Sequence, residues 1–399
     1  MAKKQSTISK VLTSIFCLII GLVLGVFGNI LFTLPDSYEI PGKVSGTNFD
    51  LTAVGDIDVE TIKRKDLSIH FMELGNKYTG DSTLIKVGEN TEILIDAGSK
   101  ASSIPAIKTY VDRYCTDGTL EYVIVTHAHE DHYAGFATNE TTDSIFDLYE
   151  VEVIIDFAKT NKSAVSGEDG YNKMYANYVR ERQAEIDAGA KWFTALDCVN
   201  ETVRNGHTAS KTFDLGNGVE LEILNHKYYT EETHSENDYS VCAMINQGDK
   251  HYLFTGDLEA DGEESLVALN LLPEVDLYKA GHHGSKTSST DALLSVIKPK
   301  AVCVCCCAGS DQYTSKLENQ FPTQIFIDNV FKYTYNVYVT TLCTNYDAGK
   351  YESFNGNIVV FANNDDTQIY VKGSNNDTIL KDTEWFKNNR KMPEVESAV

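Results

Sequence analysis

The sequence predicts an α/β domain in which two mixed sheets pack face to face with helices on the outside. Short apolar or alternating segments recur along the chain, as expected for strands. Helix-like segments with capping residues separate many of them. The alternation extends from residue 66 to residue 373, and two packed sheets are the simplest layered arrangement of that length.

The first half of this domain is expected to begin with antiparallel strands and to continue with alternating helices and strands. Turns that contain Gly or Asn separate the first strands, and a Ser followed closely by a Pro begins the first helix. The expected elements are strands at 67–74, 83–87 and 91–98, a helix at 102–115, strands at 120–129 and 151–158, and a helix at 171–189.

The second half repeats these patterns and ends with β-rich sequence, where Asn- and Gly-containing segments at 354–357 and 362–367 are typical of hairpin turns. The expected elements are strands at 211–216, 219–224, 239–246 and 250–257, a helix at 261–271, a strand at 276–281, a helix at 288–298 and a strand at 301–309.

The strand at 301–309 has the sequence AVCVCCCAG and holds four of the nine cysteines. It has no C-x-x-C spacing, and neighbouring residues of a strand point to opposite faces, so a dense disulfide framework is not expected. We interpret these cysteines as small buried hydrophobic residues. A soft-metal or redox site is the alternative.

Residues 11–34 contain no charged side chain and exceed the roughly 18 to 20 residues that cross a bilayer as a helix. Three lysines precede the segment, and Asp36 and Glu39 follow it. The positive-inside rule then places the rest of the chain outside the cytoplasmic membrane. A cleaved signal, which would release a secreted protein, is the alternative. The expected organisation is a cytoplasmic tail (1–10), a membrane anchor (11–34), a linker (35–65), the domain (66–373) and a polar C-terminal tail (374–399).

The charge balance limits the partners. With 34 Lys and Arg against 58 Asp and Glu, the formal net charge is -24, which disfavours nucleic acid because a surface that follows phosphates needs a basic face. The charge favours a small-molecule ester as substrate, and an anchored position outside the membrane fits a cell-wall ester or environmental DNA equally.

The chemistry is concentrated in the segment from Thr126 to His132, directly after an apolar strand. On a loop that leaves the strand, His127 and His129 alternate and can converge on one metal ion, while Asp131 and His132 turn toward a second. Imidazole and carboxylate ligands suit zinc, with manganese or iron as alternatives. Chance seldom produces an H-x-H-x-D-H string, so we predict metal binding.

This H-x-H-x-D-H string resembles the hallmark of the metallo-β-lactamase superfamily, which implies an αββα sandwich. The segment ILIDAG (93–98) is similar to the first motif of that superfamily, in which Asp96 would support the site. The segment LFTGD (253–257) is similar to the motif whose acid, here Asp257, would bridge two metals.

Within the superfamily, GHHGS (281–285) and END-Y-S (236–240) resemble the ComEC-type metallo-hydrolase domain and its stand-alone relatives, as does the opening segment from Ser68 to Lys86. Either His282 or His283 should complete the second metal site, and the other should act on the substrate. The resemblance also implies catalytic or substrate-facing roles, with Asp131 as a ligand rather than a general base. The further residues with such roles are Lys279, Asn237, Asp238, Ser285 and Tyr313.

Two departures are visible. Asn237 and Asp238 stand where many members of the wider superfamily have a third-motif His. The second departure is from the ComEC-type pattern, which usually has a His-Pro pair after the late strand, because no His lies between Tyr313 and Pro322. His207 is interpreted as a surface residue, since turn sequence follows it. Two other histidines, His226 and His234, are poor candidates for ligands, and His70 and His251 are expected to belong to the scaffold.

The resemblance implies a metal-dependent hydrolase with two divalent ions and a metal-activated hydroxide, of the phosphodiesterase type. A carboxyl-ester or lactone hydrolase on the same site is one alternative. A non-catalytic, membrane-tethered binding module is the other.

Overall fold

The computed structural model describes residues 58–139 and 142–393, which form two eight-stranded sheets and a small two-stranded ribbon. The first sheet has the order β18-β17-β1-β2-β3-β4-β5-β6. Its strands are β1 (Leu67–Phe71), β2 (Thr83–Val87), β3 (Thr91–Ile95), β4 (Thr119–Val125), β5 (Glu150–Asp156), β6 (Lys191–Thr194), β17 (Ile358–Ala362) and β18 (Tyr370–Gly373).

The second sheet has the order β16-β15-β14-β13-β12-β11-β10-β9, and β7 (Val203–Arg204) pairs with β8 (His207–Thr208) in the ribbon. Its strands are β9 (Thr212–Asp214), β10 (Val219–Leu224), β11 (Cys242–Gln247), β12 (Lys250–Phe254), β13 (Leu277–Lys279), β14 (Ala301–Ala308), β15 (Val337–Asn345) and β16 (Lys350–Ser353).

Both sheets are mixed. In the first, β3 to β6 are parallel and the other pairs are antiparallel; in the second, β12 to β15 are parallel and the other pairs are antiparallel. The parallel strands of each sheet therefore end at a common edge, where the loops after β4, β12 and β13 emerge. The two-sheet α/β arrangement expected from the sequence is confirmed.

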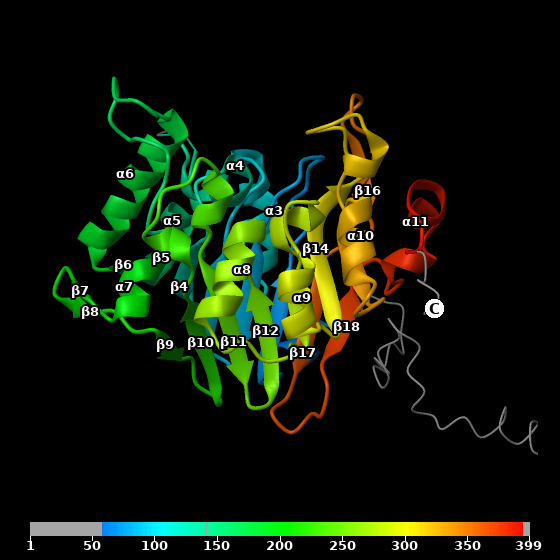
Figure 1. Ribbon diagram of the computed structural model, residues 1–399. Helices are drawn as coiled ribbons and strands as arrows, with labels where there is room; N and C mark the ends of the chain where they lie inside the picture. Colours follow the sequence, from blue (N-terminus) through cyan, green and yellow to red (C-terminus); the bar gives the residue numbers. More distant parts are fainter. Residues whose placement is uncertain (1–57, 140–141, 394–399) are drawn as a thin grey trace, which may run out of the picture. The chain divides into compact units, whose positions relative to one another are not determined.

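Helices lie on the outside, and α8, α9 and α10 cover the outer face of the second sheet (Figure 1). The helices are α2 (Val59–Ile62), α3 (Ile104–Val111), α4 (Glu130–Tyr133), α5 (Ile145–Leu148), α6 (Lys173–Ala188), α7 (Ala195–Asn200), α8 (Ala260–Leu269), α9 (Asp291–Ile297), α10 (Gln324–Val330) and α11 (Glu384–Asn389). Seven short 3-10 turns, among them Gly281–Gly284 and Glu236–Tyr239, complete the described elements.

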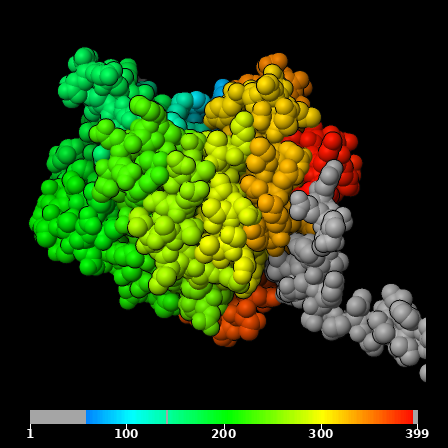
Figure 2. Space-filling view, viewed as in Figure 1, coloured from blue at the N-terminus to red at the C-terminus, as the bar shows by residue number. Residues whose placement is uncertain are grey.

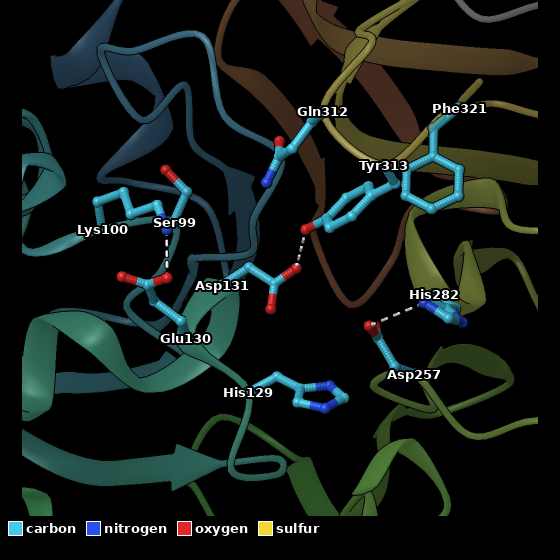
Figure 3. A pocket seen from close by; sticks show the side chains of 10 residues that line it. All are labelled: Ser99, Lys100, His129, Glu130, Asp131, Asp257, His282, Gln312, Tyr313 and Phe321. Carbon is cyan, nitrogen blue, oxygen red and sulfur yellow. Dashed lines mark hydrogen bonds and ion pairs between the residues drawn. The ribbon is translucent and has the colours of Figure 1, made fainter. Parts of the chain in front are cut away.

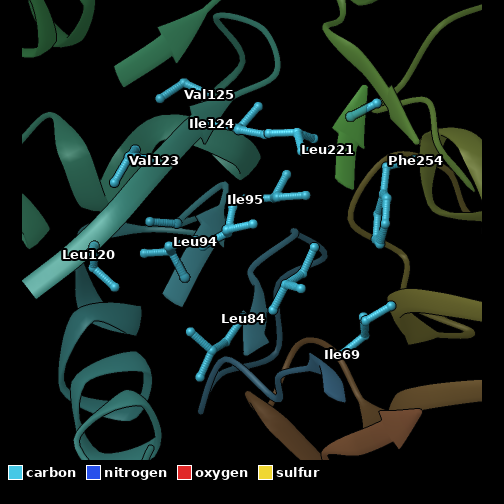
Figure 4. Packing of buried hydrophobic residues seen from close by; sticks show 14 of the residues in the cluster. Ile69, Leu84, Leu94, Ile95, Leu120, Val123, Ile124, Val125, Leu221 and Phe254 are labelled. Carbon is cyan, nitrogen blue, oxygen red and sulfur yellow. The ribbon is translucent and has the colours of Figure 1, made fainter. Parts of the chain in front are cut away.

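The main hydrophobic core lies between the sheets (Figure 4). Leu94 and Ile124 of the first sheet and Leu221 of the second are all buried in it. The rings of Phe71 and Phe254, one from each sheet, stack with centroids 6.3 Å apart. This packing fixes the two sheets against each other and so fixes the loops at their shared edge.

Strand β14 is buried along its whole length, and its four cysteines are free thiols. Burial raises the pKa of the Cys303 and Cys305 thiols well above the usual value. They are therefore unreactive, apolar residues of the core, as the sequence indicated.

The predicted anchor at 11–34 lies outside the described residues. Within the ranges 58–139 and 142–393, no helix is long and apolar enough to span a bilayer. Ile62 of α2, in the expected linker, packs into the main core, and Leu380 and Phe386, in the expected tail, are buried against the second sheet. Isolated apolar residues among polar neighbours anchor these ends.

Candidate metal centre and active site

The first histidine pair follows β4. His127 is fully buried, and His129 is half-buried at the N-cap of α4. The His127 Nε2 and His129 Nδ1 atoms are 3.0 Å apart. Burial lowers the pKa of both imidazoles, that of His127 strongly. Both rings are therefore neutral near pH 7, which is the form that binds a metal ion.

A second group of ligand atoms comes from loops of both sheets. The His132 Nε2 atom lies 3.1 Å from Asp257 Oδ2 and 3.2 Å from His283 Nε2. His283 Nε2 is 3.3 Å from the same Asp257 oxygen and 3.6 Å from Asp131 Oδ2. Three buried ligand atoms and one further carboxylate thus surround a common point.

The other ring nitrogens of these histidines are held away from that point. His132 Nδ1 lies 2.8 Å from Asp96 Oδ2, and His283 Nδ1 lies 2.8 Å from the Cys305 carbonyl oxygen. Acceptors on Nδ1 fix the tautomer with the proton on Nδ1, which leaves Nε2 free to bind metal.

Asp96 supports the His loop and His132 by hydrogen bonds, the supporting role that the sequence resemblance implied. Its backbone has a positive φ of 58°, and its carboxylate accepts hydrogen bonds from the Thr126 backbone N–H (2.8 Å) and hydroxyl (2.7 Å) as well as from His132. One side chain therefore fixes both the start of the His loop and the orientation of one imidazole.

Asp81 also belongs to the buried cluster, since ligand atoms of Asp81, His132, Asp257 and His283 all lie within 4.8 Å of one another. The Asp81 carboxylate, however, lies beside the Nδ1 atoms of His132 (3.7 Å) and His283 (3.3 Å) and forms a buried ion pair with Lys279. We therefore interpret Asp81 as a support for the ligands. The predicted Lys279 is a buried partner of this acid rather than a group open to substrate.

The donor set fits divalent metal ions. Asp257 Oδ1 is buried and has no hydrogen-bond partner, an arrangement that is costly unless a cation binds there. Burial lowers the pKa of His132, but Asp257 and Asp96 outweigh this and raise it to about 10. Without an ion, a proton on this imidazole thus balances the carboxylates; a divalent ion can replace it.

His282 and His283 differ in position although they are neighbours. Both have positive φ angles, 46° and 55°, which is unusual for a non-glycine residue and typical of functional sites. His283 is buried in the cluster just described. His282 is 20% exposed, its Nε2 atom is 3.9 Å from Asp257 Oδ2, and its Nδ1 lies 2.9 Å from the Thr287 hydroxyl. His282 therefore faces the substrate space.

A cavity of about 500 Å³ opens above the group. Figure 3 shows Asp131 at its centre, with Lys100 and Glu130 on one side and Tyr313 and Phe321 on the other. The Tyr313 hydroxyl donates a 2.7 Å hydrogen bond to Asp131 Oδ2, which ties the loop after β14 to the His loop. The lining residues are Ser99, Lys100, His129, Glu130, Asp131, Asp257, His282, Gln312, Tyr313 and Phe321.

The two residues at the expected third-motif position lie beside the ligand atoms rather than among them. Asn237 donates to Glu259 Oε1 (3.1 Å), and the Asp238 carboxylate accepts from the Thr233 hydroxyl (2.9 Å). The nearby Ser240 hydroxyl instead reaches His127 Nδ1 (3.4 Å). The predicted Ser285 lies within 3.1 Å of the Thr287 hydroxyl and so supports the His282 loop.

Several residues of this site were not predicted from the sequence, namely Asp81, Lys100, Glu259 and Phe321. Asp81 lies within the opening segment from Ser68 to Lys86 that resembles the ComEC-type domain, which was its only signal. The remaining histidines agree with their expected roles: His207 is exposed on β8, and His70 is buried between Tyr110 and Ser68. His226 is buried against the Ser240 carbonyl.

Comparison with known proteins agrees with this geometry. A family model described as "Metallo-beta-lactamase superfamily" matches residues 75–138 and 228–308, which contain both histidine groups and Asp257. Together with the two-sheet fold, the match confirms the resemblance of this part of the chain to the metallo-β-lactamase superfamily.

The more particular resemblance is to ComEC-type proteins. The chain is 34% identical over 82 residues to "Recombination protein 2" of Haemophilus influenzae, covering 21% of this chain and 10% of that protein. It is 33% identical over 72 residues to "ComE operon protein 3" of Bacillus subtilis, covering 18% and 9%. The chain thus spans about a tenth of the length of these relatives. The ComEC-type resemblance of the motifs is confirmed.

Among solved structures, the metallo-β-lactamase fold protein YhfI from Bacillus subtilis is 13% identical, with a TM-score of 0.31 over 54% of this chain and 71% of that one. A long form RNase Z from yeast is 14% identical, with a TM-score of 0.37 over 79% and 42%. Overlaps this limited carry no further argument.

Proposed function

We propose that this protein is a metal-dependent hydrolase that cleaves phosphodiesters. The observation that carries the proposal is the buried convergence of His132, His283 and Asp257 beside the His127 and His129 pair, at the floor of a cavity. The unpartnered Asp257 Oδ1 atom marks the point where the charge of a cation is needed.

Two divalent ions, with zinc as the first choice, are proposed as cofactors. His127 and His129 would hold one; His132, His283 and Asp131 would hold the other, and Asp257 would serve both. When bound, such ions lower the pKa of a water molecule and neutralise charge that develops on the substrate. His127 and His129 enter this arrangement neutral, because burial lowers the pKa of both rings.

The residues around the cavity are proposed to bind the substrate and to donate a proton to its leaving oxygen. His282 projects from a rigid turn, with Nδ1 fixed by Thr287 and near Glu259 Oε1 (3.7 Å). Its Nε2 atom is thereby directed toward the space over Asp257, where it can protonate a leaving oxygen. The Tyr313 hydroxyl orients Asp131, and Phe321 excludes water from that side of the cavity.

Phosphodiesters are preferred because the motifs resemble a branch linked to nucleic-acid handling and to cell-wall phosphocholine esters. The name of one relative refers to recombination, a process on phosphodiester-linked nucleic acid. The net charge of -24 favours a small or cationic-headed ester over nucleic acid. As part of this proposal, residues 11–34 anchor the protein in the cytoplasmic membrane with the domain outside.

Metal content gives the direct test of the proposed centre. Purified protein loaded with zinc, freed of excess metal and analysed by atomic emission should hold about two equivalents, as expected for a dinuclear hydrolase site. Absence of tightly bound zinc, manganese and iron would instead support the non-catalytic binding module.

A substrate panel separates the enzymatic alternatives. With zinc or manganese added, bis-p-nitrophenyl phosphate and p-nitrophenyl phosphocholine should be hydrolysed, whereas a lactone and nitrocefin should not. Turnover of the lactone alone would favour the carboxyl-ester alternative. Hydrolysis of nitrocefin would contradict the proposal, because Asn237 and Asp238 stand where a β-lactamase would present its third-motif His.

A further inference from the structure

A strip of alternating lysine and tyrosine side chains leads away from the cavity wall. Lys100 lines the cavity, and its Nζ atom is 5.2 Å from the centroid of the Tyr78 ring. The Lys77 Nζ atom is 5.4 Å from the same centroid and 3.9 Å from that of Tyr346. The two tyrosine rings meet edge to face at 6.4 Å. We call Lys100, Tyr78, Lys77 and Tyr346 the Lys-Tyr strip.

The Lys-Tyr strip is fixed to the cavity wall by hydrogen bonds. The Asn76 side-chain oxygen accepts from the Ser99 hydroxyl and from the Tyr78 backbone N–H, both at 2.9 Å. The Thr79 backbone N–H donates to Gln312 Oε1 at 2.8 Å. Because Ser99 and Gln312 both line the cavity, the strip continues the same surface.

The far end is held by the turn between β15 and β16. The Lys77 ammonium donates a 2.8 Å hydrogen bond to the Tyr346 carbonyl oxygen, and the Tyr351 hydroxyl donates to the Gly75 carbonyl oxygen at 2.6 Å. The Lys77 ammonium is therefore held in one place, which reduces the entropy lost when an anion binds.

The charges of the two lysines are balanced differently. Lys100 forms an ion pair with Glu130, so its charge is largely neutralised. Lys77 forms no ion pair with any carboxylate among residues 58–139 and 142–393, although the chain as a whole has a formal charge of -24. Tyrosine rings attract the ammonium without cancelling its charge. Lys77 therefore offers an uncompensated, half-buried positive charge beside the cavity.

We propose that the Lys-Tyr strip is a binding subsite for a chain of polyol phosphate units, and that it holds the phosphate next to the one being cleaved. The inference rests on the proposed function, and extends it from small esters to a polymer. A single fixed ammonium suits one phosphate at a time. Ammonium groups lie near both tyrosine rings, and the rings meet edge to face rather than parallel, so they form no parallel pair on which successive bases could stack. This distinguishes a polyol phosphate from nucleic acid.

The test compares a polymeric and a small substrate. For the full-length, metal-loaded protein, kcat/KM is measured on poly(glycerol phosphate) and on bis-p-nitrophenyl phosphate. In Lys77→Met, the ratio of the two values should fall about fivefold to tenfold, as expected for the loss of one phosphate contact. Lys77→Arg keeps the charge and should retain most of the ratio. Lys298→Met removes an exposed lysine paired with Glu274 and serves as the matched control.

The outcomes separate the subsite from the function it depends on. If the wild type cleaves both substrates and Lys77→Met leaves their ratio unchanged, the subsite is wrong and the hydrolase proposal stands. An equal loss on both substrates in Lys77→Met also overturns the subsite, since it indicates a structural role. If the wild type cleaves neither substrate, both proposals fail. A short oligothymidylate serves as a third substrate, and its preferential, Lys77-dependent cleavage would overturn the polyol assignment.

Discussion

The two sheets supply the candidate metal centre in different ways. The first sheet contributes one short segment after β4, in which His127, His129, Asp131 and His132 follow one another. The second sheet contributes Asp257 after β12 and His283 after β13, each on its own loop. The first contribution is local and rests mainly on Asp96. The second exists only because two parallel strands end at the same edge.

Because their ligands are supported differently, the two sheets should respond differently to mutation. On the first side, one carboxylate fixes the whole ligand segment, so its loss disturbs several ligands moderately. On the second side, each ligand has its own support. The Asp257 backbone N–H donates a 3.0 Å hydrogen bond to the Ser240 hydroxyl oxygen, and the Cys305 carbonyl oxygen accepts from His283 Nδ1. Substitution of one ligand there should therefore remove the role of that residue and leave the neighbouring ligand in place.

The largest effect is expected from Asp257→Ala. This carboxylate lies within 3.3 Å of both His132 and His283, so its removal should abolish binding of at least one metal and lower kcat/KM by about a thousandfold or more. Metal analysis and hydrolysis of bis-p-nitrophenyl phosphate check this. Asp249→Ala, in the exposed turn between β11 and β12, is the control. Full activity in a folded Asp257→Ala protein would contradict the proposed centre.

A comparison of His283→Ala with His282→Ala separates ligand from substrate contact within the second side. His283→Ala should lose about one metal equivalent. His282→Ala should keep its metal and lose about a hundredfold in kcat, the usual contribution of a general acid. Metal content and steady-state kinetics measured on the same preparations decide this. The assignment would be reversed if His282→Ala lost metal and His283→Ala kept it.

Asp96→Asn tests the shared support on the first side. The amide can no longer accept all three hydrogen bonds, so metal affinity should fall about tenfold to a hundredfold, as measured by competition with a chromogenic chelator. Asp156→Asn is the matched control, because Asp156 is equally buried but bonds to Tyr178 and Trp192 away from the centre. Asp156→Asn should lower the Tm without changing metal affinity. A reduced metal affinity in this control would contradict the specific supporting role of Asp96.

The smallest effect on the metal centre is expected at Glu263 of α8, whose carboxylate accepts hydrogen bonds from Ser289 and Thr290 in the segment after the His282 loop. Burial raises the pKa of Glu263 from 4.5 to about 7 despite these bonds. A raised carboxyl pKa means that stability is greatest below the unfolded-state value and is lost as pH rises toward the folded-state value.

Between pH 5 and pH 8, wild type should therefore lose up to about 3 kcal/mol of unfolding free energy relative to Glu263→Gln, which does not titrate. Urea unfolding of both proteins across this range measures the difference. A difference that is independent of pH would show that Glu263 titrates near its usual value in the folded state.

Most of the fold followed from the sequence. Apolar alternation and turn residues identified β1 to β5. The strand expected at 120–129 ends already at Val125, so that His127 and His129 lie on the loop that leaves it. The ends of the domain were harder to predict. Phe386 lies in a polar segment, and its burial depends on contacts with residues distant in sequence.

For the site, the sequence by itself determined the local features. His127, His129, Asp131 and His132 are neighbours along the chain, and their spacing after a strand sufficed to bring them together. Asp96 and Asp257 could be recognised because each ends its own strand within a motif.

Only the tertiary structure decided which distant groups join them. It selected His283 over its neighbour His282 through ring orientation, fixed by the Cys305 carbonyl. It also buried Asp81 against Lys279 and left Asn237 beside the ligands. The physical reason is that spacing along a strand fixes where a residue sits on its own element, whereas distances between loops depend on how two whole sheets pack.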